Sequence, residues 1–344
     1  MRRRDMLKGL AAVPLLASPV FTKARRAKKL KIIKPKRLKP GDTVAVIAPA
    51  SGLTQESFDK ALQNLESLGL KTKVGKAARG INGFLAATDK ERLDDLHWAF
   101  SDAELAGVWC VRGGYGAARL LPDIDYDLIR KNPKILIGYS DITALHLAVS
   151  QNTGLVTFHG PVAASELSDY TRKHVTNALM NAAAPYKIEI SEYNKTQDSN
   201  LFKTETVVAG KGRGRLVGGN LSLLSALAGT PFGLADMKGK ILFIEDVGEQ
   251  PYRIDRMFTQ LRQSFDMRAL AGIALGVFED CNPRTKDTQT LSDVVKDRFG
   301  NLGIPVVYGL SFGHIRDQFT FPVGVEAELD AGNATLTLLE TGVS

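Results

Sequence analysis

Three polar side chains come at the ends of apolar runs that are typical of strands, and their types suit a nucleophile, an orienting acid and a base. They are Ser140, Glu245 and His314. In parallel α/β sheets, functional groups gather just past the carboxyl ends of the strands. A serine activated by a histidine, which a carboxylate orients, performs nucleophilic acyl transfer. We therefore expect these three side chains to form one catalytic site.

Ser140 lies on a short turn between the apolar run 134–139 and a helical pattern that begins at Ile142. This layout is typical of a nucleophile elbow, in which the turn lifts the hydroxyl out of the sheet and the helix start offers N–H groups to an oxyanion. The alternative is structural, because serine is among the best helix N-cap residues. The motif also departs from G-x-S-x-G, since position 142 is Ile. The nucleophile hypothesis therefore depends on the acid and the base.

His314 has one rival as the base. His159 also ends a strand-like run, but it lies close in sequence to the serine. Position at a strand end in another domain favours His314. The other three histidines fall in helical patterns or a polar stretch, where we expect structural or exposed side chains: His97, His146 and His174.

Three carboxylates follow the run 240–244 and compete for the role of orienting acid. Glu245 comes first, Asp246 is expected to face the other way, and Glu249 suits the first turn of the next helix. We favour Glu245. These acids and His314 are also the ligand types of a metallohydrolase, but the chain has no H-E-x-x-H motif or paired-histidine spacing. We expect no metal and no cofactor.

Backbone groups for an oxyanion are expected in two places. Asp141 follows the nucleophile and most simply caps the helix, which leaves its backbone N–H free. The loop 112–116 is rich in glycine but is not G-x-G-x-x-G, so a nucleotide site is disfavoured there. Close backbone approach to a substrate suits Gly113 and Gly114 better. Arg112 is a candidate cation for a substrate carboxylate.

Alternating strands and helices position these residues and predict an α/β fold of two domains. Residues 40–180 should form an N-terminal domain with a mainly parallel, layered sheet of the Rossmann or flavodoxin-like kind. Residues 215–344 should form a C-terminal α/β domain with a mixed sheet, closed by a hairpin over 325–339. The polar stretch 181–214 is expected to connect the domains, with an edge strand at most inside it.

The N-terminus has the pattern of an export signal. Residues 1–24 combine a twin-arginine motif at Arg3-Arg4, a short apolar stretch and small residues near a cleavage point. We therefore expect a periplasmic protein, the alternative being an uncleaved basic anchor. No apolar run reaches the ~18–20 residues that span a bilayer, so we expect no stable membrane span after processing.

Charge is divided unevenly along the chain. Residues 1–39 hold 14 Lys or Arg and one acid, which leaves 31 basic and 36 acidic residues in 40–344. The mildly acidic body argues against a nucleic-acid partner. The basic arm 25–39 is expected to be solvated, the alternative being contact with anionic lipid. Cys110 and Cys281 are expected to be small buried hydrophobic residues rather than a disulfide.

Four motifs in order resemble one family. Val111-Arg-Gly-Gly-Tyr-Gly116, Gly138-Tyr-Ser-Asp141, Ile244-Glu-Asp-Val-Gly-Glu249 and Gly313-His314 together resemble the LD-carboxypeptidase family of serine peptidases, which includes microcin-immunity hydrolases. The resemblance runs from about residue 40 to residue 324.

The resemblance implies a triad of Ser140, Glu245 and His314, an oxyanion hole at Asp141 and the loop of Gly113 and Gly114, and a groove between two domains. It implies a murein tetrapeptide substrate, cut between the L-centre of a diamino acid and terminal D-alanine, and that two copies can associate as a homodimer. The export signal is a departure, because family members that recycle murein are cytoplasmic. Two other functions stay open: hydrolysis of microcin-like peptide conjugates, and non-catalytic binding of cell-wall peptides.

Overall fold

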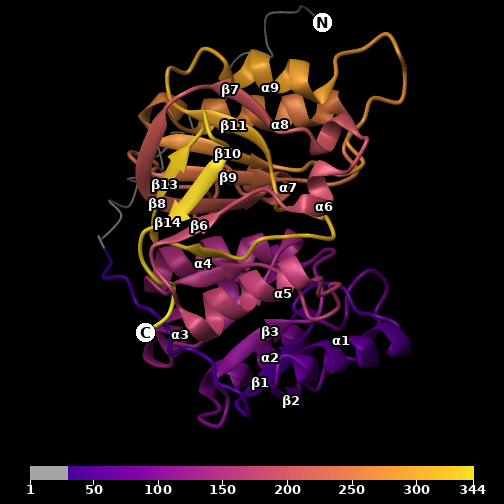
Figure 1. Cartoon of the computed structure of the whole chain (residues 1–344). Helices are drawn as coiled ribbons and strands as arrows, with labels where there is room; N and C mark the ends of the chain where they lie inside the picture. The colour runs from indigo at the N-terminus through magenta and orange to yellow at the C-terminus, as the bar shows by residue number, and fades with distance from the viewer. Residues whose placement is uncertain (1–29) are drawn as a thin grey trace, which may run out of the picture.

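The computed structural model describes residues 30–344. The expected signal peptide 1–24 and the start of the basic arm lie outside the described residues. The chain forms two α/β domains, one built on a six-stranded sheet and the other on an eight-stranded sheet, drawn in the lower and upper halves of Figure 1. Both the α/β class and the two-domain architecture were predicted from the sequence.

The first sheet has the strand order β12-β5-β4-β3-β1-β2. Its strands are β1 (Thr43–Ile47), β2 (Lys71–Val74), β3 (Gly107–Cys110), β4 (Ile135–Gly138), β5 (Thr157–His159) and β12 (Phe321–Val323). All neighbours pair in parallel except β12, which runs antiparallel to β5. Counted from β2, the order 2-1-3-4-5 is that of flavodoxin-like doubly wound sheets, as expected. Strands β3, β4 and β5 are buried along their whole length, which explains the continuous apolar runs of β3 and β4.

Helices cover this sheet and mostly begin where the sequence predicts. They are α1 (Gln55–Ser67), α2 (Asp89–Ser101), η1 (Ala117–Asp123), α3 (Tyr126–Lys131), η2 (Ser140–Ile142), α4 (Thr143–Thr153), α5 (Asp169–Thr176) and η3 (Asn177–Asn181). Thr54 and Thr88 cap α1 and α2 with their side-chain oxygens. The segment after the glycine loop forms a short 3₁₀ helix, η1, which contains Pro122; α3 follows it after a break.

The second sheet has the order β6-β14-β13-β8-β9-β10-β11-β7. Its strands are β6 (Tyr186–Ile188), β7 (Glu205–Val208), β8 (Lys211–Asn220), β9 (Ile241–Glu245), β10 (Gly272–Gly276), β11 (Val306–Leu310), β13 (Glu326–Asp330) and β14 (Thr335–Leu338). The centre, β8 to β11, is parallel and the flanking strands are antiparallel, so the sheet is mixed, as predicted. β13 and β14 form the predicted hairpin.

Short helices and three longer ones accompany the second sheet. They are α6 (Glu192–Lys195), η4 (Asn200–Phe202), α7 (Leu221–Ala226), α8 (Pro251–Ser264), η5 (Met267–Ala269) and α9 (Leu291–Phe299). The two cysteines are free and buried, as expected.

The stretch 181–214 is more than a connection. It supplies β6 and β7, which form the two opposite edges of the second sheet, and the start of β8. In the other direction, β12 comes from the expected C-terminal domain but pairs with β5 of the first sheet. The chain therefore crosses between the domains more often than the sequence indicates.

The described part of the basic arm is attached to the protein, so the expectation of a solvated arm is wrong for these residues. Ile33 makes a parallel bridge with Leu155, and the N–H of Leu38 donates to the carbonyl of Leu179 at 2.9 Å. The C-terminal residue, Ser344, donates its N–H to Pro35, so the C-terminus ends beside the first domain (Figure 1). Apolar side chains between the arm's lysines explain the attachment, since Leu38 is fully buried.

Helix α4 holds the two domains together. Every residue from Thr143 to Val149 is buried, because the helix contacts α3 and η1 of its own domain and also α7 and β8 of the other (Figure 1). A helix that is apolar all round must be enclosed by protein. No helix among residues 30–344 is long and apolar enough to cross a membrane.

Candidate active site

Ser140 stands at the sharp turn where β4 gives way to η2 and then α4. Its φ is +63°, in the left-handed region that non-glycine residues rarely occupy and that costs about 1–3 kcal/mol. The side chain caps neither helix, and its hydroxyl has no hydrogen-bond partner among the described residues. The structural alternative of an N-cap is therefore wrong, and the hydroxyl is free to react.

Glu245 and His314 form a hydrogen-bonded pair past the ends of β9 and β11, the two strands on either side of β10. Glu245 is the last residue of β9 and is fully buried, while the His314 side chain, past the end of β11, keeps 17% of its surface exposed. His314 Nδ1 lies 2.7 Å from Glu245 Oε2. This leaves the other ring nitrogen, Nε2, available for a proton from a hydroxyl.

Electrostatics favour the charged form of this pair. Burial alone would lower the pKa of His314, but the negative charge of Glu245 and the hydrogen bond to it prevail and raise that pKa. Burial likewise opposes ionisation of Glu245, yet the contacts with His314 lower its pKa. The two directions agree: the carboxylate stays ionised and makes the imidazole a stronger base.

The serine turn and the Glu–His pair belong to different domains but meet at one place. The ring of Tyr139, next to Ser140, lies 4.7 Å from the ring of His314, centroid to centroid. Below it, the N–H of Asn220 at the end of β8 donates to Thr143 Oγ1 at 3.0 Å. Because Asn220 is also the register partner of Glu245, the start of α4 is fixed beside the end of β9.

His159, the rival base, lies on the far side of Glu245 from His314. Its Nε2 is 4.0 Å from Glu245 Oε1, and the ring is only 2% exposed. Burial lowers the pKa of His159 to about 4, although Glu245 opposes that shift. A ring with so low a pKa is a weak base at neutral pH, which agrees with the preference for His314.

The two competing carboxylates have other partners. Asp246 accepts hydrogen bonds from Asn220 Nδ2 and from the N–H and hydroxyl of Ser222, and burial raises its pKa to about 6. Glu249 forms an ion pair with Arg253 at 3.5 Å. Only Glu245 among the three contacts His314.

The glycine loop touches the serine. A Cβ added to Gly113 would lie 2.8 Å from Ser140 Cβ and 3.2 Å from the backbone nitrogen of Asp141, so only glycine fits there. Gly114 is in the left-handed region at φ +106°, and its N–H has no described partner. The N–H of Asp141 lies in the first turn of η2, where a helix offers no internal acceptor. The glycine loop therefore lies against Ser140, and neither of these two N–H groups has a described partner.

Asp141 and Arg112 have hydrogen-bond partners that the sequence does not predict. The Asp141 carboxylate does not cap its own helix: it accepts the N–H of Ala117 at 2.7 Å and so caps the start of η1. Burial raises the pKa of Asp141 to about 6. Arg112 donates from Nη1 to the carbonyl of Gly52 at 3.2 Å and makes no ion pair with any residue in 30–344.

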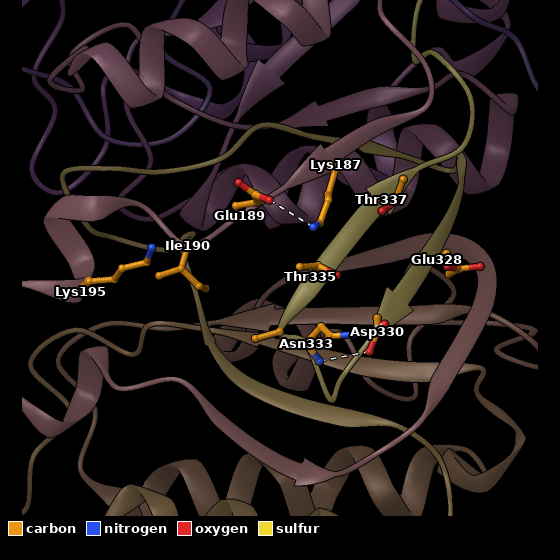
Figure 2. A pocket seen from close by; sticks show the side chains of 10 residues that line it. Lys187, Glu189, Ile190, Lys195, Glu328, Asp330, Asn333, Thr335 and Thr337 are labelled. Atoms are coloured by element: carbon orange, nitrogen blue, oxygen red, sulfur yellow. Dashed lines mark hydrogen bonds and ion pairs between the residues drawn. The ribbon is translucent and has the colours of Figure 1, made fainter.

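A separate hollow of about 590 Å³ lies on the outer face of the second sheet, away from these residues (Figure 2). Its side chains carry both charges and partly neutralise each other, as in the ion pair of Lys187 with Glu189 at 3.1 Å. None of the expected site residues lines it. In the described part of the chain, no three His, Cys, Asp or Glu side chains gather as metal ligands would.

A flavodoxin-like domain with a strained, free serine, docked on a second domain that presents a His–Glu pair, has the layout of a serine hydrolase. Comparison with known families identifies the kind of peptidase. Residues 44–160 match the family model described as the LD-carboxypeptidase N-terminal domain, and residues 213–329 match the LD-carboxypeptidase C-terminal domain. The chain belongs to the LD-carboxypeptidase family and is a serine peptidase.

Individual relatives agree along nearly the whole chain. The "Probable murein peptide carboxypeptidase" of Bacillus subtilis (strain 168) is 44% identical over 312 residues, which cover 90% of this chain and 95% of that protein. The murein tetrapeptide carboxypeptidase of Pseudomonas aeruginosa is 35% identical, over 83% of this chain and 92% of its own. The solved structure of the microcin C7 self-immunity protein MccF superposes with a TM-score of 0.80 at 26% identity, over 91% of this chain and 100% of that one.

Proposed function

We propose that this protein removes terminal D-alanine from murein tetrapeptide, at the amide that joins it to the L-centre of a diamino acid. The observation that carries the proposal is the 2.7 Å hydrogen bond between His314 and Glu245, at strand ends that meet the turn of an unpaired Ser140. Relatives named as murein peptide carboxypeptidases support the substrate class.

In the first half of the reaction, Ser140 Oγ attacks the carbonyl carbon of the penultimate residue while His314 Nε2 takes the hydroxyl proton. Glu245 stabilises the imidazolium that forms. The tetrahedral intermediate then collapses: the C–N bond breaks and D-alanine leaves with the proton that His314 held. Water, deprotonated by the same histidine, hydrolyses the acyl-enzyme and regenerates Ser140.

The oxyanion is stabilised by the N–H groups of Gly114 and Asp141. Both donors belong to backbone that is fixed before substrate arrives, so little reorganisation is needed in the transition state. One such donor contributes about 3–4 kcal/mol to transition-state stabilisation. Gly113 has no side chain, which keeps the space beside Ser140 open to the substrate carbonyl.

Arg112 is proposed to bind the terminal carboxylate of the substrate. A carboxypeptidase must recognise that charge, and guanidinium binds carboxylate with two parallel hydrogen bonds. Arg112 adjoins the glycine loop and uses only a carbonyl as a described partner, so its charge is not neutralised.

The twin-arginine pattern of residues 1–24 supports export to the periplasm, where the enzyme would trim cell-wall peptides. The family resemblance supports a homodimer. A second substrate class, microcin-like peptide conjugates, is favoured by the similarity to MccF.

Mass spectrometry of defined peptides tests the substrate proposal. The protein lacking residues 1–24 is incubated with murein tri-, tetra- and pentapeptides and with an aminoacyl sulfamoyl adenosine. We expect the tetrapeptide alone among the murein peptides to lose the mass of one alanine residue. Uncut tetrapeptide with cleaved conjugate would favour the microcin-type activity. If every compound is recovered intact, the protein only binds cell-wall peptides and the proposal is wrong.

A further inference from the structure

The loops after β1 and β3 meet at the point where the strand order of the first sheet reverses. In the order 2-1-3-4-5, the chain leaves β1 and β3 toward opposite sides, which opens a crevice at their carboxyl ends. The β3 loop contains Gly113 and Gly114, and the β1 loop contains Ser51. The two loops therefore need a contact across this crevice that keeps the glycines in place.

Ser51 joins three segments that are far apart in sequence. Its hydroxyl donates to the carbonyl of Phe84 at 2.6 Å and accepts the N–H of Tyr115 at 3.1 Å. Its own N–H donates to the carbonyl of Gly113 at 3.3 Å. Because the Ser51 hydroxyl both donates and accepts a hydrogen bond here, it links these loops and is not a free nucleophile.

These contacts fix the orientation of one peptide plane. Ser51 holds the carbonyl of Gly113, and in a trans peptide the following N–H, that of Gly114, points the opposite way. The hydroxyl accepts the N–H of Tyr115, which belongs to the next peptide plane, so the backbone is held on both sides of the Gly114 Cα. The fit is close, because a Cβ on Gly114 would collide with Ser51 Oγ. Rotation of this plane would turn the Gly114 N–H away from its present direction.

We propose that Ser51 is the positioning residue of the oxyanion loop: by binding Gly113, Tyr115 and Phe84, it aims the Gly114 N–H at the reacting carbonyl. The proposal rests on the proposed acyl transfer by Ser140. Ser51 acts through Gly114 and makes no contact with substrate. Loosening a preorganised donor by about an ångström costs about 100-fold in rate, and losing it costs about 100- to 1,000-fold.

Ser51→Ala should therefore reduce kcat about 10- to 100-fold, with KM changed less than threefold. The variant should fold, because Phe84 and Tyr115 are 65% and 52% exposed and water can solvate the groups that Ser51 releases. Ser51→Thr keeps the hydroxyl and should retain at least a third of the wild-type kcat. Ser57→Ala is the matched control, since it removes a nearby serine hydroxyl whose hydrogen-bond partner, Thr54, belongs to the same helix end.

Inhibitor affinity distinguishes positioning from general damage. The probes are a boronic acid analogue of the tripeptide product, which forms a tetrahedral adduct with a catalytic serine, and the tripeptide itself. Ser51→Ala should weaken the boronate about 10- to 100-fold and leave tripeptide affinity within threefold, since only the adduct carries the oxyanion.

Three results would overturn the proposal: Ser51→Ala with the kcat of Ser57→Ala, equal weakening of both inhibitors, or a Ser51→Thr variant as slow as Ser51→Ala. Melting temperatures are compared first, and kinetics and inhibitor binding are then measured at a temperature at which every variant is folded. Absence of D-alanine release by the wild type would contradict the proposed function itself, which separates the two failures.

Discussion

Glu245 is a charged side chain that water does not reach, and its contact with His314 is what makes that burial tolerable. A buried carboxylate is costly unless hydrogen bonds or an opposite charge compensate it. Its Oε2 has His314 at 2.7 Å, whereas Oε1 has only the His159 ring at 4.0 Å and no hydrogen bond. The acid is thus directed toward one histidine.

The pH dependence of kcat/KM should show the effect of Glu245 on the pKa of His314. Glu245 raises the pKa of His314 above its ordinary value of about 6.5, and the base works only when neutral. The acid limb of kcat/KM should therefore lie above about pH 6.5 in the wild type. In Glu245→Gln the negative charge is gone, the pKa of His314 falls, and the limb moves to lower pH while plateau kcat drops about 100- to 10,000-fold. An acid limb that stays in place would show that another group titrates there.

Substitutions of the two histidines beside Glu245 should differ strongly in their effect on activity. We expect His314→Ala to lower kcat by about 1,000-fold or more, because the base is lost. His159→Gln should cost less than about tenfold, since burial already holds that ring neutral. Steady-state release of D-alanine by both variants is the measurement. The reverse ranking would reassign the base to His159.

At the scale of elements, α4 links the nucleophile to the second domain. Its first residue, Thr143, accepts the buried N–H of Asn220, and the same helix begins three residues after Ser140. A change at this contact is felt both by the serine turn and by the end of β8. This hydrogen bond therefore ties the start of α4 to the second domain beside the serine turn.

Two buried threonines give a matched test of that bond. Thr143→Val leaves the N–H of Asn220 without an acceptor and should destabilise the protein by about 1–3 kcal/mol and lower kcat. Thr157 is equally buried, but its hydroxyl has no described partner, so Thr157→Val should be nearly neutral or stabilising. Denaturant midpoints and kcat of both variants check this. Equal destabilisation by both changes would mean that the Thr143 contact has no special role.

The elements that the sequence predicts well are those buried on both faces. β4 and β9 have uninterrupted apolar runs, and each leads to a proposed site residue, so Ser140 and Glu245 could be placed at strand ends from the sequence. β6 and β7 are edge strands with exposed or half-exposed positions, and β12 has only three residues, so their pattern is too weak to detect. Ser51 was not identified because its partners are 33 and 64 residues away and depend on the folded sheet.

At the scale of the whole molecule, shared elements and shared apolar clusters hold the two domains together. β12 returns from the second domain to the first sheet, α4 is enclosed by both, and each of the two apolar clusters draws residues from both sheets. The proposed site needs this union, because Ser140 comes from one domain and Glu245 and His314 from the other. Neither domain alone carries the proposed triad.

Because the two domains share their apolar clusters, we predict that they unfold cooperatively. Scanning calorimetry of the protein lacking residues 1–24 should show one transition, with the calorimetric enthalpy equal to the van't Hoff enthalpy. Domains joined only by a linker would instead melt separately. Two resolved peaks would contradict the continuity of the core.

The central claim is that Ser140 is the nucleophile, and kcat/KM of Ser140→Ala on murein tetrapeptide tests it most directly. The variant removes only a hydroxyl that has no described partner and keeps the Cβ, so its melting temperature should be that of the wild type. We predict that D-alanine release falls by about 10,000-fold or more. Release within tenfold of the wild type would contradict the account.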